Sequence, residues 1–130
     1  MRLVILLGLV GCGYVEKVCE AGEECVCPVA GDGEMLCDGG DCHLEFRGAG
    51  ACHLNCPDGG CSAANRAAGE MSVDCAGGAC DVVSTGAGST ELTCPGGDCS
   101  LDCSGAGSCT LYDCPDCDMT CVGMGSCERE

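Results

Sequence analysis

The chain has almost no aromatic residues: it contains no Trp, one Phe and two Tyr among 130 residues. Aromatic side chains supply much of the buried apolar area of an ordinary domain, so a core without them is small. Positive charge is also scarce, with 5 Lys and Arg against 21 Asp and Glu and a net charge of −16. This balance excludes nucleic acid as a partner, because phosphate binding depends on clustered Lys and Arg. It also argues against electrostatic docking on an anionic membrane.

Cysteine and glycine are abundant instead, with 19 Cys and 23 Gly. A cysteine fraction this high in a short chain is typical of a disulfide or metal scaffold. Where large apolar side chains are few, cross-links replace part of the missing hydrophobic stabilisation. The length is that of one domain.

The N-terminus carries the pattern of an export signal. Met1-Arg2 supplies a positive charge, and Leu3–Val10 is a continuous apolar run. The run is too short to span a bilayer, which takes about 20 residues, but it suits the apolar region of a signal peptide. It ends in Leu9-Val10-Gly11-Cys12, which resembles the lipobox of bacterial lipoproteins.

The lipobox resemblance implies cleavage before Cys12, lipidation of Cys12 and anchoring of the mature chain to a membrane. Gly13 stands where lipoproteins kept at a Gram-negative inner membrane usually carry Asp, so the resemblance implies the outer membrane if the cell is Gram-negative. Removing Cys12 from the 19 cysteines leaves 18, an even number that can close completely as disulfides. An ordinary secretory signal and a buried apolar N-terminal segment are the alternatives.

From Cys37 onward the chain repeats with a step of 19 residues, kept by two series of cysteines and one of glycines. The series are Cys37, Cys56, Cys75 and Cys94, with Cys114 after 20 residues; Cys42, Cys61, Cys80 and Cys99; and Gly50, Gly69, Gly88 and Gly107, with Gly125 after 18. A register held by both residue types predicts stacked structural repeats. We therefore expect a signal peptide over 1–11, a lipidated tether and irregular cap over 12–36, and a Cys/Gly-rich repeat region over 37–130.

Each repeat contains two short alternating segments separated by glycine turns. Cys42–Phe46 and Cys52–Cys56 alternate inward and outward positions with the period of a half-buried strand. The apolar positions recur at Ala63, Val82, Leu101 and Met119, and at Val73, Leu92 and Leu111. The sequence predicts an all-β fold: a small two-sheet parallel β-solenoid (β-helix) of about five coils, stapled by disulfides, with little or no helix outside the signal segment. A string of small disulfide loops without a continuous sheet is the alternative.

The cysteine spacing predicts bonds within each coil. Two cysteines that flank a Gly-Gly turn lie at the ends of facing strands, within the about 4.4–6.8 Å Cα separation that a disulfide requires. The predicted pairs are Cys37–Cys42, Cys56–Cys61, Cys75–Cys80, Cys94–Cys99 and Cys114–Cys117 at this turn, Cys103–Cys109 and Cys121–Cys127 at the other, and Cys27–Cys52 and Cys19–Cys25 for the remaining four. Because neighbouring coils are only about 4.8 Å apart, pairing between coils stays open.

Redox and zinc chemistry are weaker interpretations of the same cysteines. Cys114-Pro115-Asp116-Cys117 has CxxC spacing, but a redox motif needs a following helix that lowers a thiol pKa, and a strand-like segment follows here. Paired CxxC knuckles for zinc are absent, and an exported compartment oxidises thiols. His43 and His53 each follow an inward cysteine, so we expect both on the surface, on opposite sheets.

Calcium is the alternative function. Five aspartates fall in the region of the Gly-Gly turns, which loosely resembles the calcium-binding β-roll of repeats-in-toxin proteins; they are Asp38, Asp41, Asp58, Asp98 and Asp116. The GGxGxDxUx nonapeptide of that family is absent, and its coil has about 18 residues rather than 19. Aspartate also favours turns without any ion.

The sequence predicts no enzyme and no cofactor, because no catalytic constellation stands out. The outward positions are mixed and charged, unlike the flat threonine ladder of disulfide-rich ice-binding solenoids. We expect an exported lipoprotein of the cell envelope, held on the membrane by lipidated Cys12. Its role would be structural, or that of an adhesion or interaction module toward an unidentified protein or surface.

Overall fold

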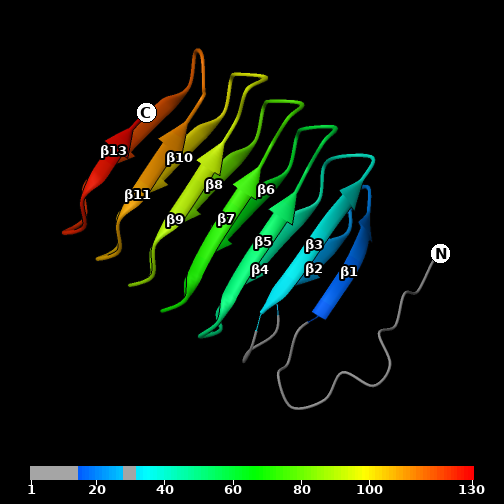
Figure 1. Cartoon of the computed structure of the whole chain (residues 1–130), viewed down its shortest axis with the longest axis horizontal. Coiled ribbons are helices and arrows are strands. Elements are labelled where there is room, and N and C mark those ends of the chain that lie inside the picture. Colours follow the sequence, from blue (N-terminus) through cyan, green and yellow to red (C-terminus); the bar gives the residue numbers. More distant parts are fainter. Residues whose placement is uncertain (1–14, 28–31) are drawn as a thin grey trace.

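The structure is a computed structural model that describes residues 15–27 and 32–130. In this part of the chain every regular element is a β-strand, and the strands form two parallel sheets (Figure 1). The seven-stranded sheet contains β1 (Val15–Glu20), β3 (Gly33–Asp38), β5 (Ala51–Asn55), β7 (Glu70–Asp74), β9 (Thr90–Thr93), β11 (Cys109–Tyr112) and β13 (Cys127–Arg129). The six-stranded sheet contains β2 (Glu24–Val26), β4 (His43–Phe46), β6 (Ser62–Asn65), β8 (Asp81–Ser84), β10 (Ser100–Cys103) and β12 (Asp118–Cys121). The predicted all-β, two-sheet solenoid is confirmed.

The chain alternates between the sheets, so each coil consists of one strand from each sheet and two connecting turns. Figure 1 shows the coils stacked side by side from the N-terminal to the C-terminal end. Through most of the stack the register keeps the step of the cysteine series, which places His43, Ser62, Asp81 and Ser100 in one row. Near the two ends the step is shorter by a single residue, since β1 pairs Val15 with Gly33 and β10 pairs Ser100 with Asp118.

The stack has about six turns rather than the expected five. The additional turn comes from β1 and β2, in the segment that we expected to form a tether and an irregular cap. β1 pairs with β3 along its whole length, and β2 does the same with β4. Four glutamates of this segment are exposed in the structure: Glu16, Glu20, Glu23 and Glu24. The described part of this segment is therefore regular.

The core is a narrow layer of aliphatic side chains between the sheets. The six-stranded sheet contributes Leu44, Ala63, Val82 and Leu101, and the seven-stranded sheet contributes Met35, Leu54, Val73, Leu92 and Leu111; all are at most 3% exposed. These are the two apolar columns that the repeat predicts, extended into β3 and β4. Phe46, the only phenylalanine, is fully buried. One aliphatic side chain per strand is a small core, so cross-links must add to its stabilisation.

Glycine is required at one turn by the close approach of successive coils. A Cβ at Gly69, Gly88 or Gly107 would overlap the carbonyl oxygen of the glycine one coil earlier in the chain. At the Gly-Gly turns the reason is different. Gly59 and Gly60 have φ values of 80° and 75°, in the left-handed region that glycine adopts without steric cost.

No helix long and apolar enough to cross a membrane occurs among the described residues. The predicted signal peptide over 1–11 and the predicted lipidation site Cys12 lie outside the described residues.

Candidate functional site

Nine disulfides join all 18 cysteines of the described residues. The pairs are Cys19–Cys25, Cys27–Cys52, Cys37–Cys42, Cys56–Cys61, Cys75–Cys80, Cys94–Cys99, Cys103–Cys109, Cys114–Cys117 and Cys121–Cys127. Their Cα–Cα separations run from 5.6 to 6.6 Å, inside the usual range of about 4.4–6.8 Å. The structure thus pairs these cysteines across turns rather than up the column of stacked coils.

Cys27–Cys52 is the exception among these nine, because it joins two successive coils. The position six residues before Cys52 is Phe46, and the position six residues after Cys27 is Gly33, so neither cysteine has a partner across its own turn. Gly33 pairs in register with Cys52. The Cys27 side chain therefore reaches the cysteine of the next coil.

In the middle of the stack, a buried polar network takes the place that the Cys103–Cys109 disulfide has one coil later. The Nδ2 atom of Asn65 donates to Thr90 Oγ1 at 2.9 Å, and Thr90 Oγ1 donates to Ser84 Oγ at 3.0 Å. Asn65 Oδ1 accepts a hydrogen bond from the Ala67 backbone N–H at 3.0 Å. The residues Asn65, Ser84 and Thr90 are at most 1% exposed, and their hydrogen bonds satisfy the buried polar atoms.

Sequence reasoning missed this network, although the register contains the signal for it. Ser84 pairs with Cys103 and Thr90 pairs with Cys109. The two polar residues therefore occupy the positions that a disulfide takes one coil later. Asn65, in turn, occupies the position of Phe46.

This register predicts that a Ser84→Cys/Thr90→Cys variant forms a tenth disulfide in the described part of the chain. The new bond would match Cys103–Cys109, whose Cα atoms are 6.6 Å apart. The cross-link should raise the free energy of unfolding by up to about 2 kcal/mol, less the hydrogen bonds that it removes. Intact mass measures the bond, and thermal melting measures its effect. In the control variant Ser84→Cys/Glu91→Cys, the second cysteine lies on the exposed face, and both thiols should stay free.

The clusters of potential metal ligands in the described residues consist of cysteine alone. They are Cys94, Cys99, Cys114 and Cys117; Cys37, Cys42 and Cys61; Cys56, Cys75 and Cys80; and Cys103, Cys121 and Cys127. The turn aspartates proposed for calcium do not form such a cluster. Asp58 instead accepts a hydrogen bond from the Gly39 backbone N–H at 3.1 Å. Asp41 and Asp98 adopt positive φ values of 60° and 62°, so they have a conformational role in the turns.

The two histidines lie on opposite sheets, as expected, and each contacts carboxylates. On the outer face of the seven-stranded sheet, His53 Nε2 is 2.8 Å from Asp74 Oδ2, and His53 Nδ1 is 3.6 Å from Glu34 Oε2. A groove runs beside His53 and is lined by Glu34, Glu70 and Glu91 among others. The charge of Glu91 is the main cause that raises the pKa of the Tyr112 hydroxyl. This face is therefore strongly acidic.

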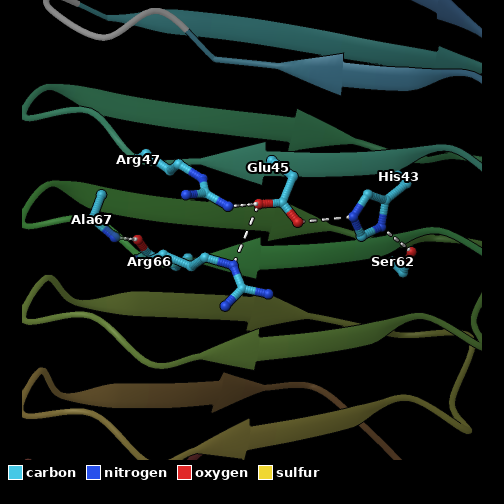
Figure 2. Close-up of polar contacts among 7 residues, drawn as sticks. His43, Glu45, Arg47, Ser62, Arg66 and Ala67 are labelled. Carbon is cyan, nitrogen blue, oxygen red and sulfur yellow. Dashed lines mark hydrogen bonds and ion pairs between the residues drawn. The ribbon is translucent and has the colours of Figure 1, made fainter.

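The outer face of the six-stranded sheet carries a polar cluster around Glu45 (Figure 2). Glu45 Oε1 is 3.4 Å from Arg66 Nε and 3.5 Å from Arg47 Nη2, while Glu45 Oε2 is 3.1 Å from His43 Nε2. His43 Nδ1 is 2.7 Å from Ser62 Oγ. An ionised carboxylate only accepts hydrogen bonds, so His43 Nε2 is the donor to Glu45. In neutral His43 the Nδ1 atom then accepts a hydrogen bond from the Ser62 hydroxyl.

The order Ser62, His43, Glu45 is that of a nucleophile, a base and a residue that orients the base. Acyl transfer also requires donors aimed at a developing oxyanion. The backbone N–H of Ser62 is already used within the sheet, where it donates to Cys42 O at 2.9 Å. The cluster is best interpreted as a network that ties β4 to β6.

The pKa of the Glu45 carboxyl lies below its usual value of 4.5. The hydrogen bond from His43 is the largest cause, and the charges of Arg66 and Arg47 lower the pKa further, while partial burial opposes them. Because the folded state favours the ionised carboxylate, the stabilisation is present above the unfolded pKa and is lost as pH falls through the folded pKa.

We therefore expect Glu45→Gln to destabilise the protein at neutral pH by up to about 1 kcal/mol, the scale of exposed ion pairs. The difference from the unmodified protein should shrink as the pH falls below the usual carboxyl pKa of 4.5. Urea unfolding at pH 7 and pH 3 measures this trend. Glu70→Gln, an exposed carboxylate on the opposite sheet, is the matched control. An equal effect of Glu45→Gln at both pH values would contradict the assignment.

No known protein family, curated protein or solved structure matches this chain. Inference about function therefore depends on the chemistry of its own residues.

Proposed function

We propose that the chain is an exported lipoprotein, anchored to a membrane through Cys12, with a structural, adhesion or interaction role at the cell envelope. The observation that carries the proposal is the pairing of the 18 described cysteines in nine bonds, which leaves Cys12 as the nineteenth. Disulfides persist in exported proteins and are rare in a reducing cytosol. Cys12 is also the cysteine at the lipobox position.

The outer faces of the solenoid support a role in contacts with a large partner. On the seven-stranded sheet, one row of outward side chains runs from coil to coil: Glu34, His53, Ser72, Glu91, Thr110 and Glu128. In-register parallel strands hold such a row at a spacing of about 4.8 Å. A repeating polar row of this kind suits an extended surface or a protein partner better than a small molecule.

Metabolic labelling with an alkyne fatty acid in a Gram-negative host tests the anchor. The unmodified chain should incorporate the label and fractionate with the outer membrane, and Cys12→Ala should lose both properties. Gly13→Asp is the matched control, because it should keep the label but move to the inner membrane. An unlabelled wild-type chain, or a label that persists in Cys12→Ala, would refute the anchor.

A further inference from the structure

The two ends of the stack carry edge strands. Among the described strands, β1 and β13 are the edges of the seven-stranded sheet, and β2 and β12 are the edges of the six-stranded sheet. The last coil is accordingly less buried: Met119 is half-buried, whereas Leu101, its partner in register, is 1% exposed. An edge strand presents backbone groups on which a strand of another chain can pair. Each end is therefore a surface on which a second copy could stack, unless it is protected.

The inner column of the seven-stranded sheet ends in a positive charge on both sides. Lys17 on β1 pairs in register with Met35, and Arg129 on β13 pairs in register with Leu111. Residues paired in this way lie on the same face of a sheet, so both cations stand on the side of the core. The five aliphatic residues between them are at most 1% exposed. The whole column is Lys17, Met35, Leu54, Val73, Leu92, Leu111 and Arg129.

The Arg129 side chain is held across the C-terminal end. Its Nη2 atom donates to Cys117 O at 3.1 Å and to Cys114 O at 3.4 Å. These carbonyl groups belong to the turn that leads into β12, so the side chain reaches from one sheet toward the other. Arg129 is exposed, and its charge keeps contact with water.

Lys17 has the corresponding place at the N-terminal end. Lys17 Nζ is 3.8 Å from Glu23 Oε2, and its side chain is 42% exposed. Glu23 directly precedes β2, and its Oε1 atom accepts a hydrogen bond from the Glu20 backbone N–H at 2.7 Å. This cation also reaches from one sheet toward the other.

We propose that Lys17 and Arg129 are end caps that keep the solenoid from stacking end to end on a second copy of the chain. In such a stack each cation would take a core position between two coils. Burial would remove the water around its charge, which is costly without a well-placed partner of opposite charge. Natural sheets use inward charges at their edges to prevent pairing with other chains. The sides of the rod then remain for other partners. This inference does not rest on the proposed membrane anchor.

Arg129→Leu tests the cap at the C-terminal end. Every sample is the oxidised full chain with Cys12→Ala, which removes the predicted lipidation site, in a mild detergent that shields the apolar run near the N-terminus. Salt at about 0.15 M limits repulsion between the acidic copies to about 8 Å. Sedimentation and native mass spectrometry measure the oligomeric state, and circular dichroism checks the fold. The parent chain should be monomeric. Arg129→Leu should dimerise, with a dissociation constant lower by about 100-fold or more.

The stoichiometry identifies the end that is used. A chain that keeps Lys17 can join only through its C-terminal end, so Arg129→Leu should stop at a two-fold dimer. Addition of Lys17→Leu should extend the dimers to longer rods, because both ends then lack a cap. Arg47→Leu is the matched control and should stay monomeric. It also replaces an exposed arginine by leucine, but that arginine lies beside Glu45 on the side of the rod.

A parent chain that already dimerises, a folded Arg129→Leu variant that stays monomeric, or equal dimerisation of Arg47→Leu would overturn the proposal. A double variant that stops at dimers would overturn the cap at Lys17. Arg129→Met, which keeps an unbranched side chain without the charge, decides the question if Arg129→Leu does not fold. Arg129→Met should dimerise and Arg129→Lys should not, and a monomeric Arg129→Met would count equally against the cap.

Discussion

Complete reduction in the presence of a chelator is expected to abolish the β-sheet circular dichroism of the protein. In the described part of the chain the core contributes about one aliphatic side chain per strand, and one phenylalanine is the only aromatic residue in it. Eight of the nine disulfides close loops with sequence separations of 3 to 6, and Cys27–Cys52 spans 25. A loop of this small size contributes about 2 kcal/mol to stability. The summed contribution of the nine bonds is larger than the net stability of an ordinary domain, which is about 5–15 kcal/mol.

The reduced chain should therefore lie on the unfolded side of the equilibrium. Alkylation of the thiols before the measurement prevents reoxidation, and the oxidised protein carried through the same buffers is the control. A β-sheet spectrum and a cooperative thermal transition that survive complete reduction and alkylation would show that the aliphatic core is sufficient without the disulfides.

Gly88→Val should destabilise the oxidised protein by more than about 3 kcal/mol, or prevent its folding. Gly88 lies at the turn where backbones of successive coils touch. A Cβ there would overlap Gly69 O and would lie 2.9 Å from the Ala68 carbonyl carbon. These neighbours are backbone atoms, so no change of side-chain rotamer relieves the overlap. The two coils would have to separate, which would break the hydrogen bonds of the sheets near the turn.

Ala87→Val is the matched control for Gly88→Val. Ala87 occupies the preceding position of the same turn but is exposed, so its substitution should change stability by less than about 0.5 kcal/mol. Urea unfolding of both variants with the disulfides intact measures the difference. Similar midpoints for the two variants would mean that the coils do not stack as closely at Gly88 as the structure indicates.

The repeat made most of the fold predictable. Its constant step aligns Val73 with Leu92 and Val82 with Leu101, and parallel pairing without a register shift follows directly from it. Side chains alternate between inward and outward along each strand, and this alternation places the cysteines at inward positions next to the turns. The first coil was harder to recognise, because its step to β3 is shorter than the repeat and its sequence is rich in glutamate. A strand at the end of a stack has fewer neighbours, so it shows less of the shared pattern.

The polar contacts were less predictable than the strands. The network of Asn65, Ser84 and Thr90 was not predicted, because none of these residues matches the Cys and Leu pattern. Only the register shows that their side chains meet in the interior. The cluster around Glu45 likewise depends on Arg66, which comes from the next coil. Contacts between coils combine residues that are a whole repeat apart, and composition does not show which of them touch.

Disulfide mapping of the intact oxidised protein is the most direct test of the account. Cleavage at Asp58, which lies between Cys56 and Cys61, should leave two peptides joined by that bond, and cleavage at Asp98 should do the same for Cys94 and Cys99. We expect the nine pairs of the structure and a gain of two hydrogens for each of them on reduction. Bonds that run up the column, such as Cys56 to Cys75, or free thiols among these 18 cysteines would contradict a solenoid stapled coil by coil.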